Sequence, residues 1–278
     1  MQTRRCFALL LLCTSVTLAW ASAGPAVFDV HLHYNAEDAR AFTPREIVAI
    51  LERNAVPRAV VTSTPPDHAE RLYHYAPERI VPFLGVYRSR SEKDTWFADE
   101  TLPARVEAEL ARGPWRGVGE LHLFAEQRHS PVFRRLVEVA AERRLVLLVH
   151  ADPAVIDRLF EIAPAATVIW AHAGAYPYPP LLGDYLDRYP QLYIDLSVRE
   201  RQIAPEGRLD TQWELLLLER TERFLVGVDT FSTRRWRHFD AVTEEIRGWL
   251  AQLPPEVAAQ IASGNAERLF PPSDAAAP

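Results

Sequence analysis

The sequence has few thiols and few lysines. Of its 278 residues only two are cysteines, Cys6 and Cys13, and both lie near the N-terminus. Disulfide frameworks, cysteine-ligated zinc, thiol nucleophiles and iron-sulfur clusters are therefore excluded from the body of the chain. Among the 31 basic residues only Lys93 is a lysine. Any lysine-based chemistry depends on that one side chain.

An excess of positive charge is also lacking. The chain carries 37 acidic and 31 basic residues, which gives a formal charge of −6. Proteins that bind nucleic acid through its phosphates usually present a basic surface. We therefore expect a small-molecule substrate and no nucleic-acid partner. The oligomeric state is not determined by the sequence.

The N-terminus predicts an export signal. Arg4 and Arg5 precede the mostly apolar stretch 7–20, and Ala-Ser-Ala at 21–23 resembles a signal-peptidase site. We expect residues 1–23 to be removed and the protein to be periplasmic or extracellular, exported by the Sec or the twin-arginine route. A stable membrane anchor is not expected, because a spanning helix needs about 20 apolar residues.

Beyond residue 23, short runs of β-branched and aliphatic residues alternate with segments of helical spacing. The runs cover 26–33, 58–62, 80–87, 117–123, 145–150, 167–172, 192–196 and 224–229. The helical segments cover 44–54, 67–76, 102–112, 131–144, 153–163, 180–189, 210–221 and 240–250. This alternation predicts an α/β protein, a single-domain (β/α)₈ TIM barrel over residues 24–272, with a doubly wound open sheet as the alternative. Residues 273–278 are expected to form a loose tail.

Histidines and carboxylates stand at the ends of these runs. His31 and His33 are two residues apart, so both point to the same side of a strand. Later runs end in the other candidate ligands, which are Glu120, His150, His172 and Asp229. Because the carboxyl ends of barrel strands meet at one face, we expect these side chains in one pocket. Nitrogen and oxygen donors without thiolate predict a divalent metal, with Zn²⁺ favoured and Mn²⁺ or Fe²⁺ as alternatives.

Two more polar residues lie on the same runs. Asp29 precedes His31 by two residues and should lie deeper in the barrel, where we expect it to orient a ligand imidazole by accepting its second N–H. His122 follows Glu120 by two residues on the same strand face, and we expect it beside the metal ligands rather than among them.

These motifs resemble the metal-dependent amidohydrolase superfamily. The His31-Leu32-His33 pair, His150, His172 and Asp229 match its ordered motifs, and the closing segment 264–270 matches as well. The segments 170–174 and 189–197 resemble the amidohydrolase-related branch. The resemblance covers nearly all of the mature chain. It implies a metal-dependent enzyme on a TIM barrel but not its substrate.

One departure from the superfamily concerns lysine. Many binuclear members bridge two metals with a carboxylated lysine on the fourth strand, whereas Lys93 lies in the polar segment 88–94. Glu120 takes the fourth-strand position, as in TatD-like deoxyribonucleases and other glutamate-bridged members. His122 stands where those enzymes usually have glycine, so nuclease activity is not expected.

The resemblance leaves the number of metals and the reaction open. In the arrangement that we favour, one metal is held by His31, His33, His150 and Asp229. In the other arrangement, Glu120 and His172 complete a second site. A bound metal acidifies a water molecule and polarises the substrate oxygen. Asp229 is expected to accept the water proton, and His172 to hydrogen-bond the developing oxyanion.

Arginines that follow the predicted strands indicate the substrate. Arg88 follows the third run and Arg199 the seventh, and Tyr176 follows the sixth as a candidate pocket wall. Because arginine pairs with carboxylates and phosphates, we expect hydrolysis of a small anionic ester, lactone or amide. A decarboxylase or lyase of the same superfamily is one alternative. A metal-binding protein without catalysis is the other.

Overall fold

The eight strands form one parallel sheet in which neighbours in sequence are neighbours in space. The computed structural model describes residues 25–272, so the predicted signal 1–23 and tail 273–278 lie outside the described residues. The strands are β1 (Phe28–His33), β2 (Arg58–Thr62), β3 (Ile80–Leu84), β4 (Gly117–Leu123), β5 (Val146–Ala151), β6 (Val168–Trp170), β7 (Leu192–Asp195) and β8 (Phe224–Leu225).

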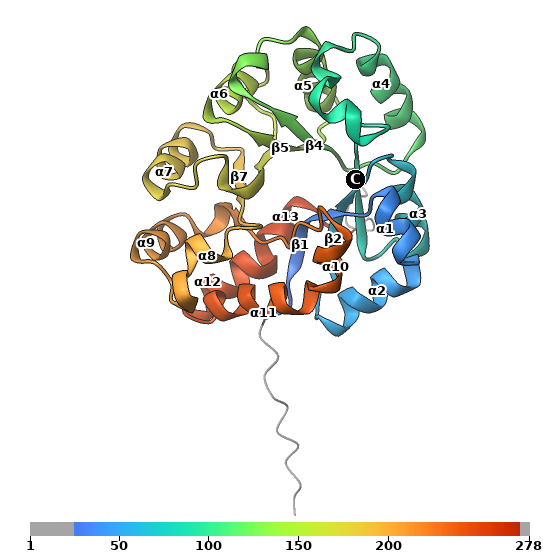
Figure 1. Cartoon of the computed structure of the whole chain (residues 1–278). Helices are drawn as coiled ribbons and strands as arrows, with labels where there is room; N and C mark the ends of the chain where they lie inside the picture. Colours follow the sequence, from blue (N-terminus) through green and yellow to red (C-terminus); the bar gives the residue numbers. More distant parts are fainter. Residues whose placement is uncertain (1–24, 273–278) are drawn as a thin grey trace, which may run out of the picture.

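Backbone hydrogen bonds join the last strand region to the first. The amide of Val30 donates to the carbonyl of Val226 at 3.0 Å, and the amide of Asp229 donates to the carbonyl of His31 at 2.7 Å. The strands therefore curve round into a nearly closed barrel, with the helices outside them (Figure 1). The predicted (β/α)₈ barrel is confirmed, and the sequential strand order excludes the doubly wound sheet.

The main helices agree with the predicted segments. They are α2 (Pro44–Arg53), α3 (Asp67–Tyr75), α4 (Leu102–Arg112), α5 (Pro131–Glu142), α6 (Pro153–Ile162), α7 (Pro179–Arg188), α9 (Thr211–Glu219) and α11 (Phe239–Leu250). Several begin with proline, whose fixed φ suits the first helical turn and whose missing N–H is not needed there. Within residues 25–272, no helix combines the length and the apolar composition needed to cross a bilayer.

Short helical turns fill the loops and the C-terminal segment. They are α1 (Ala36–Ala41), η1 (Arg90–Asp94), η2 (Trp96–Ala98), η3 (Ala125–Gln127), η4 (Ala171–Ala173), α8 (Glu200–Ile203), η5 (Pro205–Gly207), η6 (Thr221–Arg223), α10 (Thr233–Arg237), α12 (Pro255–Ala259), η7 (Gln260–Gly264) and α13 (Asn265–Leu269). Turns of this length are too short to produce a clear period in the sequence. Many of them follow a strand, at the face where TIM-barrel sites are built.

An apolar plug fills the interior of the barrel. Phe28 on β1 and Phe83 on β3 are fully buried, and both pack on Phe270, which follows α13, with ring centroids 6.0 and 5.7 Å apart. A separate and larger apolar layer lies between the strands and the surrounding helices. The plug leaves the carboxyl ends of the strands as the place for polar side chains.

Candidate metal centre

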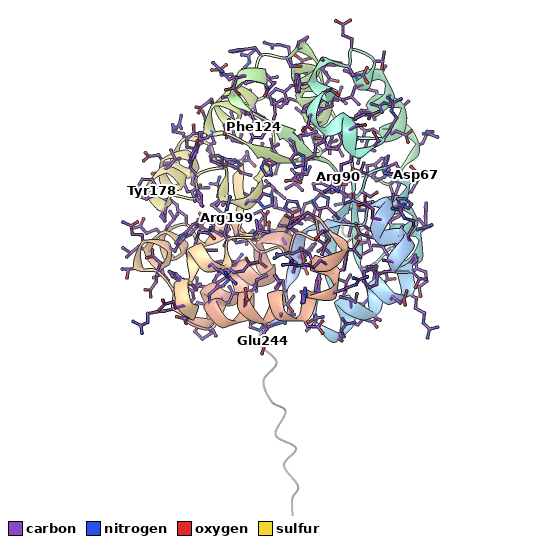
Figure 2. The ribbon with its side chains drawn as sticks, viewed as in Figure 1. Asp67, Arg90, Phe124, Tyr178, Arg199 and Glu244 are labelled. Carbon is purple, nitrogen blue, oxygen red and sulfur yellow. The ribbon has the colours of Figure 1, made fainter. Side chains whose placement is uncertain are left out.

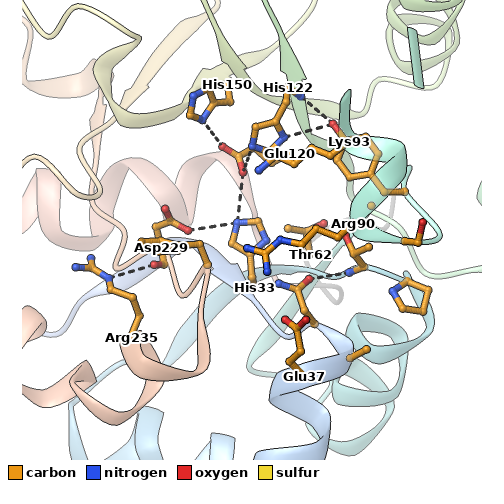
Figure 3. Close-up of a pocket in the computed structure, with 18 of the residues that line it drawn as sticks. His33, Glu37, Thr62, Arg90, Lys93, Glu120, His122, His150, Asp229 and Arg235 are labelled. Carbon is orange, nitrogen blue, oxygen red and sulfur yellow. Dashed lines mark hydrogen bonds and ion pairs between the residues drawn. The ribbon is translucent and has the colours of Figure 1, made fainter. Parts of the chain in front are cut away.

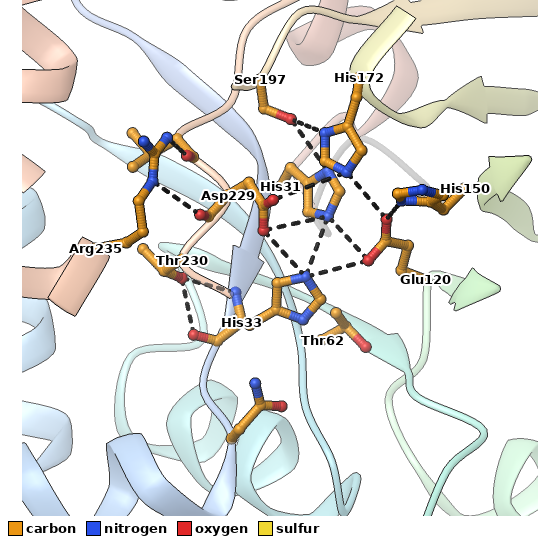
Figure 4. A network of polar contacts seen from close by, with 12 residues as sticks. His31, His33, Thr62, Glu120, His150, His172, Ser197, Asp229, Thr230 and Arg235 are labelled. Carbon is orange, nitrogen blue, oxygen red and sulfur yellow. Dashed lines mark hydrogen bonds and ion pairs between the residues drawn. The ribbon is translucent and has the colours of Figure 1, made fainter. Parts of the chain in front are cut away.

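Two imidazoles of β1 meet a carboxylate that follows β8. Nε2 of His31 lies 3.2 Å from Nε2 of His33. Oδ1 of Asp229 lies 3.3 Å from Nε2 of His33 and 3.8 Å from Nε2 of His31. Figure 4 shows the three side chains converging from the two ends of the sheet. The structure therefore brings together the first, second and last of the predicted ligands.

Glu120 lies between two pairs of imidazoles. Its Oε2 atom is 3.5 Å from Nε2 of His31 and 3.4 Å from Nε2 of His33. Its Oε1 atom is 3.1 Å from Nδ1 of His150 and 3.2 Å from Nε2 of His172. The two oxygens of one carboxylate thus face different imidazole pairs. His150 therefore groups with His172. The one-metal arrangement favoured from the sequence grouped it with His31 and His33 instead.

The backbone before Glu120 requires glycine. Gly119 has a φ of 137°, and a Cβ at this position would lie 2.2 Å from the carbonyl oxygen of Leu148 on β5. The pairing of β4 with β5 also shifts register between Val118 and Leu121. This close approach of β4 and β5 sets the direction in which the Glu120 side chain points.

His172 and Asp229 lie beyond the ends of their strands, in left-handed backbone conformations. Their φ values are 59° and 54°, a region that costs a residue other than glycine about 1–3 kcal/mol. The predicted strand runs extended through both residues, but β6 ends at Trp170 and β8 at Leu225. The amide of His172 donates to Oδ2 of Asp195, and Arg235 donates to the carbonyl oxygen of Asp229. These contacts hold both residues in place.

A buried carboxylate that our sequence reasoning missed orients the rings. Oδ2 of Asp195 accepts from Nδ1 of His31 at 2.8 Å and from the hydroxyl of Ser197 at 2.6 Å. The oxygen of Ser197 in turn accepts from Nδ1 of His172 at 2.9 Å. When the rings are neutral, this chain of donors places the proton of both histidines on Nδ1, so Nε2 offers the lone pair that a metal ion would bind. The sequence did contain a signal for this role, because Asp195 is a carboxylate at the end of the seventh strand.

The prediction that Asp29 accepts a ring N–H is wrong. Its carboxylate accepts from the backbone amide of His31 at 2.9 Å and from that of Val228 at 3.2 Å. The prediction assumed regular alternation along the strand, but the pairing of β1 with β2 shifts register between Asp29 and Leu32. Asp29 instead joins β1 to the segment that follows β8.

His122 lies against Glu120 and His150, and these three side chains form a further group that could hold a metal ion. Its Nε2 atom is 3.2 Å from Oε2 of Glu120, and its ring stacks on His150 with centroids 4.8 Å apart. Its amide donates to the hydroxyl oxygen of Tyr87 at 2.9 Å, and Nδ1 lies 3.3 Å from the same oxygen. Burial lowers the pKa of His122 to about 4 despite the opposing charge of Glu120, so its imidazole is neutral at pH 7.

The buried groups of the centre keep both signs of charge. Burial raises the pKa of Glu120, but the imidazoles of His122 and His31 outweigh burial and hold it well below its usual range. Burial lowers the pKa of His31, but Asp229 and Glu120 outweigh burial and raise it well above its usual range. The same opposition raises the pKa of His33 and lowers that of Asp229. These buried carboxylates therefore stay ionised because they face the imidazoles of the cluster.

The donor set fits a divalent metal such as zinc. Ligand atoms bound about 2.0–2.1 Å from a tetrahedral zinc are separated by roughly 3.3 Å, close to the 3.2–3.5 Å spacings among Nε2 of His31, Nε2 of His33 and Oε2 of Glu120. Oδ1 of Asp229 is buried, and among residues 25–272 it faces only Nε2 of His33 and Nε2 of His31, at 3.3 and 3.8 Å, with no other hydrogen-bond donor. A buried carboxylate oxygen without a donor is costly unless it binds a cation.

A cavity of about 850 Å³ opens above these ligands. His33, Glu120, His150, His172 and Asp229 form its floor, and the loops after the strands form its walls. Figure 3 shows the labelled residues pointing into this space. Its size suits a small molecule that reaches the metal ligands from solvent.

Two of the three predicted substrate-binding residues line the cavity, and the third does not. Arg88 and Arg199 both line the cavity, but Arg88 pairs with Glu92 at 2.7 Å, and Arg199 donates to the carbonyl oxygens of His172 and Gly174. Tyr176 is 66% exposed and lies outside the cavity lining, so its prediction as a pocket wall is wrong.

Comparisons with known proteins agree with this fold. Residues 77–271 match the family model of the amidohydrolases, whereas no curated protein sequence matches the chain. An amidohydrolase from Burkholderia multivorans with bound zinc is 16% identical, with a TM-score of 0.56 over 89% of this chain and 100% of that one. A TatD homologue from Escherichia coli K12 is 15% identical, with a TM-score of 0.60 over 88% of this chain and 98% of that one.

A more distant structure shares the same architecture. A Xaa-Pro dipeptidase with bound methionine is 12% identical and has a TM-score of 0.54 over 88% of this chain and 75% of that one. At these identities the solved structures show a common fold, while the family model extends over more than half of the sequence. The chain belongs to the amidohydrolase family and is a metal-dependent hydrolase.

Proposed function

We propose that this amidohydrolase cleaves a small anionic ester, lactone or amide with a metal-activated water molecule. The observation that carries the proposal is the orphaned Oδ1 of Asp229 among the Nε2 atoms of His31 and His33, beneath an open cavity. A divalent metal bound there, most simply Zn²⁺, supplies Lewis acidity for the water and for the substrate oxygen.

The distances support two groups of metal ligands. Nε2 of His31, Nε2 of His33, Oδ1 of Asp229 and Oε2 of Glu120 form the first group. Nδ1 of His150, Nε2 of His172 and Oε1 of Glu120 form the second. Because each group includes one oxygen of Glu120, the chain could hold two metal ions, and we favour a metal-to-chain ratio of two over the single-metal arrangement expected from the sequence.

Asp229 and His172 have distinct proposed roles. Asp229 takes the proton of the attacking water through the carboxylate oxygen that a metal on Oδ1 would leave free, and passes the proton to the leaving group. His172 acts as a ligand rather than as a donor to the oxyanion. Its ring proton is engaged on Nδ1 by Ser197, so Nε2 offers a lone pair and no hydrogen.

Elemental analysis and product analysis of the mature protein test this function. We expect two equivalents of zinc, manganese or iron per chain and hydrolysis within a panel of carboxylate-bearing esters, lactones and amides. Oxygen from ¹⁸O-labelled water should enter the product. Release of CO₂ without ¹⁸O incorporation would instead identify a decarboxylase, and a metal-replete protein that is inert on the whole panel would contradict catalysis.

The Asp229→Asn variant tests the proton acceptor. It should lose turnover while it retains metal, because His31, His33 and Glu120 remain as ligands. Near-normal turnover by this variant would exclude Asp229 as the base.

We also propose that the enzyme is exported. The support is the sequence of residues 1–23, with its paired arginines, apolar stretch and Ala-Ser-Ala site. N-terminal sequencing of the protein from the periplasm or the medium should begin at Gly24. A protein that keeps Met1 and stays in the cytoplasm would contradict this proposal.

A further inference from the structure

We propose that Lys93, Arg90 and Arg40 form a binding subsite for an anionic group, a carboxylate or a phosphate, that the substrate carries away from its scissile bond. We call these three residues the cationic wall. The proposal rests on the proposed hydrolase function and adds which residues select the substrate. It also replaces Arg88 and Arg199, the two arginines to which the sequence pointed.

The other basic residues of the cavity have hydrogen-bond or ion-pair partners, and the cationic wall differs from them in this respect. Arg88 pairs with Glu92, Arg199 donates to two loop carbonyls, and Arg235 donates to the carbonyls of Val228 and Asp229 and lies 3.5 Å from Glu200. The side chains of the cationic wall line the same cavity and have no such partner among residues 25–272. Figure 3 labels two of them, Arg90 and Lys93. Their donors remain available to a ligand.

The charge of the cavity favours an anion. Six basic side chains line it, against three acidic ones, Glu37, Glu120 and Asp229. Two of these carboxylates face the histidines of the metal centre, so Glu37 alone is left to balance the walls. A bound divalent metal adds positive charge to the same space. An anionic group is therefore the ligand that this cavity attracts most strongly.

The cationic wall is close enough to the reaction centre to hold the far end of a small substrate. Lys93 on η1 is partly buried and lines the same cavity as His122 and Glu120. Nε2 of His122 is itself only 3.2 Å from Glu120. In the view of Figure 2, Arg90 lies toward the middle of the molecule, whereas Tyr178 and Glu244 lie at its edge. An anion on Lys93 would therefore share the cavity with the metal ligands.

Paired substrates test the selectivity of the cationic wall. The probes are 4-nitrophenyl butyrate, which is neutral, and mono-4-nitrophenyl glutarate, which bears a terminal carboxylate. In the Lys93→Gln and Arg90→Gln variants, the ratio of kcat/KM for the anionic ester to that for the neutral ester should fall about 10- to 100-fold, as for a lost charged hydrogen bond. Lys93→Arg should restore most of the ratio.

A matched control removes an arginine far from the cavity. Arg112 on α4 is 70% exposed and pairs with Glu109 of the same helix, so Arg112→Gln should leave the ratio unchanged. An unchanged ratio in both Lys93→Gln and Arg90→Gln would overturn the subsite, even if the enzyme hydrolyses both esters.

The single lysine allows a second measurement that does not depend on turnover. Reductive methylation with formaldehyde and cyanoborohydride modifies only one side-chain amine in this sequence, that of Lys93, and peptide mass mapping follows it. Glutarate in one arm and inorganic phosphate in the other should slow this reaction in the metal-replete enzyme, and the arm with the stronger effect identifies the anion.

The failures of the two proposals are distinguishable. If neither anion protects Lys93 in an enzyme that hydrolyses the neutral ester, the subsite is overturned and the hydrolase function stands. Protection of Lys93 in a protein that hydrolyses neither ester would support the subsite as an anion site and contradict the proposed substrates.

Discussion

At the scale of single residues, Asp195 controls the metal centre without contacting the cavity. Its carboxylate fixes the ring of His31 directly and that of His172 through Ser197. Removal of such an orienting partner typically weakens metal binding by about 10- to 100-fold. We expect Asp195→Asn to raise the dissociation constant for zinc by that factor, measured by competition with a chromophoric chelator.

Asp157 provides the control for Asp195. Its carboxylate accepts from Tyr185 and Tyr189 near the surface, between α6 and α7. Asp157→Asn removes one negative charge from the same fold and should leave zinc affinity unchanged. Equal affinities in the two variants would exclude the orienting role of Asp195.

Tyr87 sets the tautomer of His122. The Tyr87 oxygen accepts from the amide of His122, so its hydrogen is directed to Nδ1. Nε2 must then carry the ring proton that is donated to Glu120 at 3.2 Å. In ¹⁵N-resolved NMR spectra, His122 should be the Nε2–H tautomer at pH 7, and Tyr87→Phe should yield a mixture of both tautomers. A single unchanged tautomer in the variant would contradict this assignment.

At the scale of elements, β4 depends on one glycine. An alanine at position 119 would place its Cβ 2.2 Å from Leu148 and require a φ of 137°. Gly119→Ala should therefore lower the free energy of unfolding by about 1–3 kcal/mol or more and disturb Glu120, with a fall in both thermal midpoint and metal content.

Gly248 supplies the opposite case for comparison. It lies on the exposed side of α11, and a Cβ there would meet no atom within 4 Å. Because alanine favours the helix, Gly248→Ala should raise the free energy of unfolding by about 0.5–1 kcal/mol. Thermal denaturation of the two variants side by side separates a conformational requirement at position 119 from a general effect of losing glycine.

At the scale of the whole molecule, metal binding and stability should depend together on pH. The raised pKa values of His31 and His33 mean that the metal-free fold gains stability from their protonated rings below about pH 6.5 and loses it as pH rises through the raised values. A metal needs neutral rings, so bound protons compete with it. The zinc-induced rise in melting temperature should be larger at about pH 8 than at about pH 5.5.

Scanning calorimetry with and without zinc checks this dependence. The double variant His31→Gln and His33→Gln lacks both competing rings but keeps His150, His172 and Glu120, so its zinc-induced rise at pH 8 should be smaller than that of the wild type. A rise in wild-type protein that is equal at both pH values would show that these rings do not exchange protons for metal.

The sequence by itself determined the alternation of strands and helices, the metal chemistry and most of the ligands. Apolar runs that are buried on both faces, proline at helix starts and polar residues at strand ends are local signals, so they appear in the order of residues. His31, His33, Glu120, His150, His172 and Asp229 were all predicted, and Figure 4 shows that they lie together. The fold brings strand ends to one face wherever the barrel closes.

Only the tertiary structure decided how these residues are grouped and which basic side chains of the cavity have no partner within the described part of the chain. The register shift in β1 turned Asp29 toward the backbone, and the end of β7 placed Asp195 against His31. Lys93 is distant in sequence from every ligand, yet η1 brings it to the cavity. Pairing between segments far apart in the chain depends on shape and neighbouring charge, and no local pattern of residues encodes those contacts.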